Sequence, residues 1–353
     1  MMARTHPLVS VVMPTRDRPM LLVEAVGSVL RQTYRHFELL VVNDGGTSVA
    51  HRLHRPGAPI HLIELPRPVG PAAARHLALT HAHGSLVAYL DDDDLFHEDH
   101  LRCLVEALTG PDACSLVYTG ADLVQLERRG DAWQVARQAM PIPPFDRRRL
   151  LVANYIPLIC VGHSLADYHE AGGFDRTLPC LEDWDLLLRL TRERGARHLP
   201  WVTAAYRQFQ GITRVNALTR QGLEVLQRIY ARHPVDPALQ RSRQEHLVQR
   251  ARDLRLVNRL RAGVQQGLSH AADALGQGNA TRAARILAEI RARVPDDGEI
   301  LLALAGARQV LGHHQAALEL LAEARRRDPF LAGRGSRSRH RDDDPRHLAG
   351  DPA

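Results

Sequence analysis

The chain has 353 residues, of which 44% are hydrophobic and 24% charged, a composition typical of a water-soluble protein of about two domains. It contains no apolar run of roughly eighteen residues, which excludes a transmembrane helix, and it begins without a signal-peptide layout. We therefore expect a cytoplasmic protein, and a peripheral contact with the inner face of the membrane remains open. The net charge of +6 fits an anionic substrate or membrane surface, and the low aromatic content of 5%, without any nucleic-acid motif, predicts no nucleic-acid partner.

The first third of the chain alternates apolar runs with amphipathic segments. Strands are expected at 8–13, 37–42, 60–65 and 86–90, and the segments between them contain helical patterns, the first opening at Pro19. Polar residues follow the carboxyl ends of the first, second and fourth strands. This order predicts an α/β fold with an open, largely parallel sheet, in which ligands bind beyond the carboxyl ends of the strands.

Four consecutive carboxylates, Asp91 to Asp94, come directly after the fourth of these strands. Like charges in a row gain nothing from packing, whereas clustered carboxylate oxygens suit Mg²⁺ or Mn²⁺, which in turn would hold a diphosphate. The alternative interpretation is a solvated acidic turn that caps the helix expected from about His97.

The segment 97–232 continues the alternation of helices and strands. We expect a helix at 97–109, a strand at 115–119, an exposed hairpin at 121–139 that turns around Gly130, and an amphipathic helix at 216–232. A second acidic group, Glu182, Asp183 and Asp185, opens a further helix in which Trp184 lies beside apolar residues and is expected to be part of the core. By themselves, acids at this position complement the helix dipole.

The C-terminal third reads as an all-α module. An Arg-rich connecting helix is expected at 236–263, and an internal repeat follows at 264–332, in which Gly278 and Gly312, like Pro295 and Pro329, are separated by 34 residues (312 minus 278). This is the period of tetratricopeptide repeats, each a pair of helices. The module either binds a protein partner, mediates self-association or caps the first domain, and 333–353 is expected to be a disordered tail.

The four cysteines, Cys103, Cys114, Cys160 and Cys180, show no C-x-x-C spacing. We therefore expect buried, reduced thiols rather than disulfides or zinc ligands.

Four motifs in order, VSVVMPTRDRP, ELLVVNDGG, PVGPAAARHLAL and VAYLDDDDLF, resemble the nucleotide-sugar-binding half of family 2 inverting glycosyltransferases of the GT-A fold. The resemblance covers about residues 7–232. It implies a catalytic domain at 1–235 built on a nucleotide-sugar-binding mixed sheet flanked by helices, followed by the helical-repeat module.

The resemblance also implies a role for individual side chains, in a donor site and a base. Pro14, Thr15 and Arg16 are expected to contact the nucleotide, Asp44 is expected to accept a hydrogen bond from its base, typically a uracil N–H, and Arg75 is expected to lie near the ribose or diphosphate. Asp93 is expected to bind the divalent metal, and Asp91 to contact the ribose or, through water, the metal. Asp92 is expected to contact the nucleotide sugar as well, and Asp94 fits the same motif. Asp183 is expected to be the general base, with Glu182 orienting it or the acceptor.

Two positions depart from the family pattern. Many relatives carry two adjacent acids where this chain has Asn43 and Asp44, which leaves the nucleotide itself less defined than its binding. Many relatives also place a histidine near the diphosphate where this chain reads Arg207, Gln208, Phe209 and Gln210. Either Arg207 or Gln208 substitutes for that histidine, or the metal has fewer protein ligands.

These features predict a metal-dependent inverting glycosyltransferase that moves a sugar from a nucleotide-diphosphate donor, a UDP-sugar by preference, to a hydroxyl of a glycan or glycolipid of a cell-surface polysaccharide. A nucleotidyltransferase on a similar sheet is the first alternative, although MPTRDRP is not the Gly-rich phosphate loop of such enzymes. The second alternative is a non-catalytic transferase-like scaffold that binds protein partners through its repeats.

Overall fold

The computed structural model describes residues 6–110, 114, 116–129, 132–140, 142–209 and 219–293, with single positions between 304 and 320. The chain divides into two compact units. The first comprises residues 1–126, 135–209 and 214–257, and the second comprises 127–134, 210–213 and 258–353.

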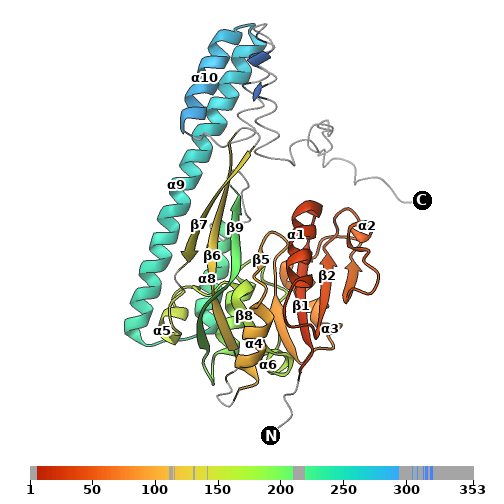
Figure 1. The fold of residues 1–353 in the computed structure, drawn as a ribbon. Helices are drawn as coiled ribbons and strands as arrows, with labels where there is room; N and C mark the ends of the chain where they lie inside the picture. The colour runs from red at the N-terminus through yellow and green to blue at the C-terminus, as the bar shows by residue number, and fades with distance from the viewer. Residues whose placement is uncertain are drawn as a thin grey trace, which may run out of the picture. The chain divides into compact units, whose positions relative to one another are not determined.

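The N-terminal half of the sheet is parallel, as predicted. Strands β1 (Val9–Thr15), β2 (Phe37–Asn43), β3 (Ile60–Glu64) and β4 (Leu86–Tyr89) lie in the order β3-β2-β1-β4 (Figure 1). β1 is central, with Val9 paired to Phe37 of β2 and to Leu86 of β4, and it continues through Pro14 to Thr15. The carboxyl ends of β2, β1 and β4 are therefore adjacent, which brings together the three loops that follow them.

The sheet becomes mixed beyond β4. There the order continues β4-β8-β6-β9-β5, with β8 (Val161–Ser164) antiparallel to β4 and to β6 (Leu116–Arg129). β9 (Arg197–Phe209) runs parallel to β6, while β5 (Leu95–Phe96) is antiparallel to β9. β7 (Ala132–Met140) pairs with β6, so the two strands of the expected hairpin are present. The strand expected at 115–119 and the first strand of this hairpin form one continuous strand, β6. The turn around Gly130 lies outside the described residues.

Helices of the first unit pack on this sheet. α3 contacts β1 and β2, α1 contacts β5, and α4 and α6 contact β8. Both α1 and α3 begin with a proline, whose missing N–H costs nothing in the first turn. The described helices that lie wholly in the first unit are α1 (Pro19–Leu30), α2 (Ala50–Leu53), α3 (Pro71–Thr80), α4 (His100–Leu108), α5 (Arg147–Leu150), the 3₁₀ helix η1 (Leu158–Cys160), α6 (Leu165–Glu170), α7 (Glu182–Leu190) and α8 (Arg220–Arg232).

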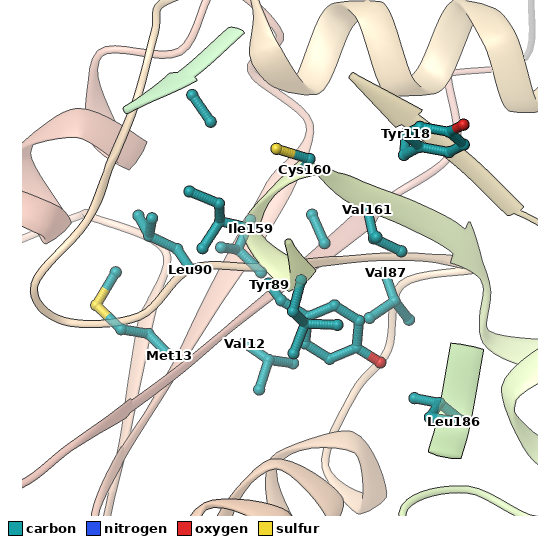
Figure 2. Close-up of a cluster of buried hydrophobic side chains, with 14 of the residues drawn as sticks. Val12, Met13, Val87, Tyr89, Leu90, Tyr118, Ile159, Cys160, Val161 and Leu186 are labelled. Carbon is teal, nitrogen blue, oxygen red and sulfur yellow. The ribbon is translucent and has the colours of Figure 1, made fainter. Parts of the chain in front are cut away.

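One hydrophobic core joins the two halves of the sheet. Figure 2 shows the Tyr89 ring among Val12, Val87 and Val161, and Leu186 of α7 belongs to the same buried cluster. The Tyr89 hydroxyl is not left without a partner, because it lies 2.8 Å from Nε2 of His163. Since α7 is packed into this core by its leucines, the acidic residues at its N-terminus are held at a fixed place relative to β4.

The structure agrees with the cysteine prediction for two of the four side chains, because only Cys103 and Cys160 are buried. All four thiols are free; Cys103 and Cys160 are buried and Cys114 and Cys180 half-buried.

The second unit contains the C-terminal part of α9 (Pro237–Gly276) and all of α10 (Ala280–Arg293). Gly278 has a φ of 76°, and the Asn279 side chain accepts a hydrogen bond from the Arg282 N–H, so the chain turns sharply and the new helix is capped. A Cβ at Gly267 would lie 2.4 Å from Cδ1 of Ile290, so the glycine permits a close approach of the two helices. Most of the second predicted repeat, including Gly312 and Pro329, and the tail lie outside the described residues.

Within the described part of the chain, no helix combines the length and the apolar character needed to cross a bilayer.

Candidate active site

The tetra-aspartate lies in a tight turn immediately after β4. The turn closes with a hydrogen bond from the Asp94 N–H to the Asp91 carbonyl, and carboxylate oxygens of Asp91, Asp93 and Asp94 lie within 4.8 Å of one another. Asp93 and Asp94 are buried, whereas the Asp91 side chain is 39% exposed. Three hard oxygen donors this close, one of them open to solvent, fit Mg²⁺ or Mn²⁺. The structure therefore adds Asp94 to the predicted pair Asp91 and Asp93.

Cationic and polar groups hold this turn in place. Arg18 Nη1 lies 3.1 Å from both Asp92 Oδ1 and Asp93 Oδ2, and the Thr15 hydroxyl donates to Asp92 Oδ2 at 2.7 Å. Burial raises the pKa of Asp92 to about 6, against the opposing effects of Arg18 and Thr15. Asp92 is thus a buried anchor that ties the turn to the end of β1, and its oxygens are engaged within the protein.

Arg207 is the first of the four residues near which the family pattern places a histidine, and its contacts reach the aspartate turn. Its backbone N–H donates to Asp94 Oδ1 at 2.7 Å, and its Nε donates to the Asp93 carbonyl at 2.6 Å. A further guanidinium contact reaches Glu24. Arg207 therefore fixes the conformation of the aspartate turn through hydrogen bonds to Asp93 and Asp94.

The loop after β2 is organised around Asp44. Its carboxylate accepts hydrogen bonds from the N–H groups of Val69, at 2.6 Å, and Gly70, at 3.0 Å, and it is buried. Asn43 donates to the Thr47 carbonyl at 3.0 Å, so its amide closes the turn. Asp44 thus connects the loop after β2 to the loop before α3, at the edge of the sheet where Arg16 is exposed to solvent.

The two acidic groups are joined by Arg75, a single buried side chain on α3. Its Nη2 donates to Asp91 Oδ1 at 2.6 Å, and its Nη1 donates to Glu182 Oε1 at 2.7 Å. Burial alone would lower the pKa of Arg75, but Asp91 and Glu182 outweigh it and raise the pKa above its usual value. The aspartate turn and the N-terminus of α7 therefore belong to one site.

Asp183 lies beside Glu182 in the first turn of α7. The side-chain amide of Asn154 donates to Asp183 Oδ2 at 3.1 Å, and the carboxylate is half-buried, so part of it is open to a ligand. Burial, with repulsion from Glu182 second, raises the pKa of Asp183 to about 6. A carboxylate with such a pKa is still ionised at neutral pH but accepts a proton more readily than an ordinary aspartate.

The remaining predicted positions divide between site and core. Pro14 and Thr15 end β1 next to the aspartate turn, whereas Trp184 is buried and donates to the Leu150 carbonyl at 2.8 Å, as expected of a core residue. Asp185 pairs with Arg189 at 2.7 Å, apart from the groups that Arg75 joins. Sequence reasoning assigned no role to Arg18 or Asn154: Arg18 was visible within the TRDRP motif, but Asn154 is in a loop with no signal of its own.

Comparisons with known proteins find similar families for both parts of the chain. Residues 10–166 match the family model described as glycosyl transferase family 2, and residues 274–333 match a tetratricopeptide repeat model. Residues 10–166 are therefore similar to glycosyl transferase family 2. The predicted family resemblance and the predicted repeats are both confirmed.

Relatives with curated names point the same way. The chain is 28% identical over 200 residues to the uncharacterized glycosyltransferase YwdF of Bacillus subtilis, covering 56% of this chain and 73% of that protein. It is 32% identical over 127 residues to the putative teichuronic acid biosynthesis glycosyltransferase TuaG of the same organism, covering 35% of this chain and 50% of TuaG. It is 27% identical over 207 residues to the putative colanic acid biosynthesis glycosyl transferase WcaA of Escherichia coli, covering 56% of this chain and 70% of WcaA.

Solved structures establish the fold. S. aureus TarS 1-349 aligns with a TM-score of 0.52 at 16% identity, over 92% of this chain and 91% of that chain. The mannosyltransferase PcManGT from Pyrobaculum calidifontis, in complex with GDP-Man and Mn²⁺, aligns with a TM-score of 0.51 at 18% identity, over 92% and 88%. The mixed sheet flanked by helices is the GT-A fold that the sequence predicts.

Proposed function

We propose that the chain is a family 2, metal-dependent inverting glycosyltransferase that uses a nucleotide-diphosphate sugar, by preference a UDP-sugar. The observation that carries the proposal is the double contact of Arg75, which joins the metal-type carboxylates to the α7 carboxylates. An enzyme of this kind needs a cation site for the diphosphate and a base for the acceptor within one cleft.

The donor half of the site consists of Asp91, Asp93 and Asp94 with the loops after β1 and β2. A divalent cation bound there would offset the negative charge that develops on the departing diphosphate. A related structure was determined with GDP-Man and Mn²⁺, and another with UDP, which supports this donor class. Thr15 at the end of β1, Arg16 in the loop after β1 and Asp44 in the loop after β2 are the residues that we assign to the nucleotide.

The acceptor half is Asp183. Inversion at the anomeric carbon is a direct displacement, in which an acceptor hydroxyl loses its proton while it attacks. The exposed part of the Asp183 carboxylate takes that proton, Asn154 fixes the orientation of the carboxylate, and Glu182, held by Arg75, raises its basicity through repulsion.

The acceptor is proposed from the names of the relatives. Two of them are named for the biosynthesis of teichuronic acid and colanic acid, which supports a glycan or glycolipid acceptor and a role in a cell-surface polysaccharide. The repeat module is then available for a protein partner or for self-association at the site of synthesis.

A release assay tests the proposal. The purified full-length chain is incubated with a panel of nucleotide sugars and Mn²⁺, and free nucleoside diphosphate is measured with and without glycan acceptors. We expect transfer to require Mn²⁺. It should fall by about 10²–10⁴-fold in Asp183→Asn and be unchanged in Asp253→Asn. Asp253, on α9, accepts a hydrogen bond from Gln249 and serves as the matched carboxylate control. An equal loss of transfer and of nucleotide binding in Asp183→Asn would remove Asp183 from the role of base.

A further inference from the structure

A large hollow lies beside α7, apart from the carboxylates of the proposed active site. Its volume is about 760 Å³, which is within the usual range for small-molecule sites. Five arginines line it, contributed by α5, the loop before α7, α7 itself, the segment after α7 and α8: Arg147, Arg176, Arg189, Arg192 and Arg232. All of these side chains belong to the first compact unit.

Among the described residues, two carboxylates line the hollow, and both are paired with arginines. Asp185 Oδ2 accepts from Nε of Arg189 at 3.0 Å and from Nη2 at 2.7 Å. Asp175 pairs with Arg232 Nη1 at 2.6 Å. Five arginines against two aspartates leave a formal charge of +3 in the lining.

The excess charge comes from Arg147, Arg176 and Arg192. Arg147 donates to neutral groups, the Leu188 carbonyl at 2.7 Å and the Thr191 hydroxyl at 2.5 Å. Burial and then the neighbouring Arg192 lower the pKa of Arg147, and the opposing effect of Glu193 is smaller. Arg192 has an exposed contact with Glu193 at 3.4 Å, and within the described residues Arg176 forms no ion pair. Guanidinium groups gathered in a concave surface focus positive potential and suit phosphate or carboxylate oxygens.

The hollow is also lined by two residues, Asp185 and His233, that each have a buried polar atom in long ion-pair contacts. Oδ1 of Asp185, a residue 1% exposed, lies 3.5 Å from Arg232 Nη1 and 3.7 Å from His233 Nε2. Within the described part of the chain, neither Asp185 Oδ1 nor His233 Nε2 forms a hydrogen bond, and their contacts are these longer ion pairs. Because a hydroxyl group both donates and accepts, one ligand hydroxyl can satisfy both atoms.

We propose that this hollow is a second saccharide site, which binds an acidic sugar. The phosphate or carboxylate of that sugar contacts Arg147, Arg176 and Arg192, and one of its hydroxyls bridges Asp185 and His233. The site goes beyond the proposed transfer reaction, because it uses none of the groups assigned to donor or base.

The test is a binding titration of the full-length chain in EDTA, so that no cation supports the donor site. Glucose 6-phosphate, glucuronate, glucose and inorganic phosphate are titrated in turn by calorimetry. Saturable binding of at least one of the two acidic sugars, with none for glucose and weaker binding for inorganic phosphate, is the expected result. The tighter of the two acidic sugars identifies the anionic group.

Charge-matched double variants make the test specific. Arg176→Gln with Arg192→Gln should weaken binding by about tenfold or more, because charged hydrogen bonds are lost at two exposed positions that the fold does not need. Arg102→Gln with Arg220→Gln removes the same charge from exposed pairs elsewhere and should leave binding unchanged. The proposal would be overturned if both double variants weakened binding equally, or if the Arg176/Arg192 variant kept its affinity. It would also be overturned if no acidic sugar bound saturably, or if inorganic phosphate bound as tightly as glucose 6-phosphate. None of these results depends on glycosyl transfer.

Discussion

Replacing Asp183 with asparagine should make the protein more stable at neutral pH, although it lowers transfer by about 10²–10⁴-fold. Asp183 has its pKa raised from 3.8 to about 6, so its ionised form is disfavoured in the folded protein relative to the unfolded chain. A difference of about 2 pH units corresponds to about 3 kcal/mol, since each pH unit is worth about 1.4 kcal/mol. Asparagine resembles the protonated carboxyl group and is spared this cost.

The sign of the pH dependence follows from the direction of the shift. Because the folded-state pKa is raised, the wild-type protein carries no penalty from Asp183 below about pH 4, where the carboxyl is protonated in both states. The penalty then grows as pH rises from about 4 to about 6 and is constant above that. The stability gain of Asp183→Asn should therefore be near zero at pH 4 and approach about 3 kcal/mol at pH 7.5.

Urea unfolding of both proteins between pH 4 and pH 8 measures this difference directly. The same residue should give wild-type kcat/KM an acid limb near pH 6, below which the rate falls about tenfold per pH unit. A variant that is no more stable than wild type at pH 7.5, or whose gain is the same at every pH, would refute the assignment of a raised pKa to Asp183. Asn154→Ala removes a hydrogen bond to the same carboxylate and should move the acid limb to higher pH.

Three further outcomes are expected. Asp93→Ala should lose the Mn²⁺-dependent part of UDP binding in calorimetry, and a native protein whose UDP affinity ignores Mn²⁺ would contradict the metal assignment. Arg75→Gln leaves Asp91 and Glu182 close together without their shared cation, so urea unfolding should show a loss of about 3 kcal/mol or more, and a loss below about 0.5 kcal/mol would mean that the contact is dispensable. A chain that ends at residue 263 should retain transfer to small acceptors if the repeats are a separate module, whereas an insoluble product would indicate that they cap the catalytic domain.

The parallel half of the sheet could be predicted because its signals are local. Each of β1, β2 and β4 is a short apolar run that ends at a polar loop, and their burial is nearly complete. The mixed half of the sheet was harder to predict from the sequence, because β9 pairs in parallel with β6 from a distant part of the chain and the pairing shifts register near Gly120. No periodicity within either strand specifies such a partner.

The site was predictable in its chemistry but not in its connections. The aspartate run and the α7 acids stand out as charge clusters, and the order of motifs gives them roles. Arg75, in contrast, contacts carboxylates 16 and 107 positions away, and from its own neighbours it can equally face solvent or a phosphate. The packing of α3 against β1 and β2 turns the Arg75 side chain inward, where the two carboxylates offset the cost of burying its charge.

The two acids of α7 show how helix geometry separates neighbouring residues. Asp183 and Asp185 are two positions apart, a spacing that points side chains to different sides of a helix. Asp183 therefore faces Asn154 and the groups held by Arg75, while Asp185 is buried against Arg189 and the arginine-lined hollow. The sequence EDWD reads as one acidic cluster, but its two aspartates serve different surfaces. If the hollow binds a saccharide, its occupant contacts the same helix that holds the proposed base.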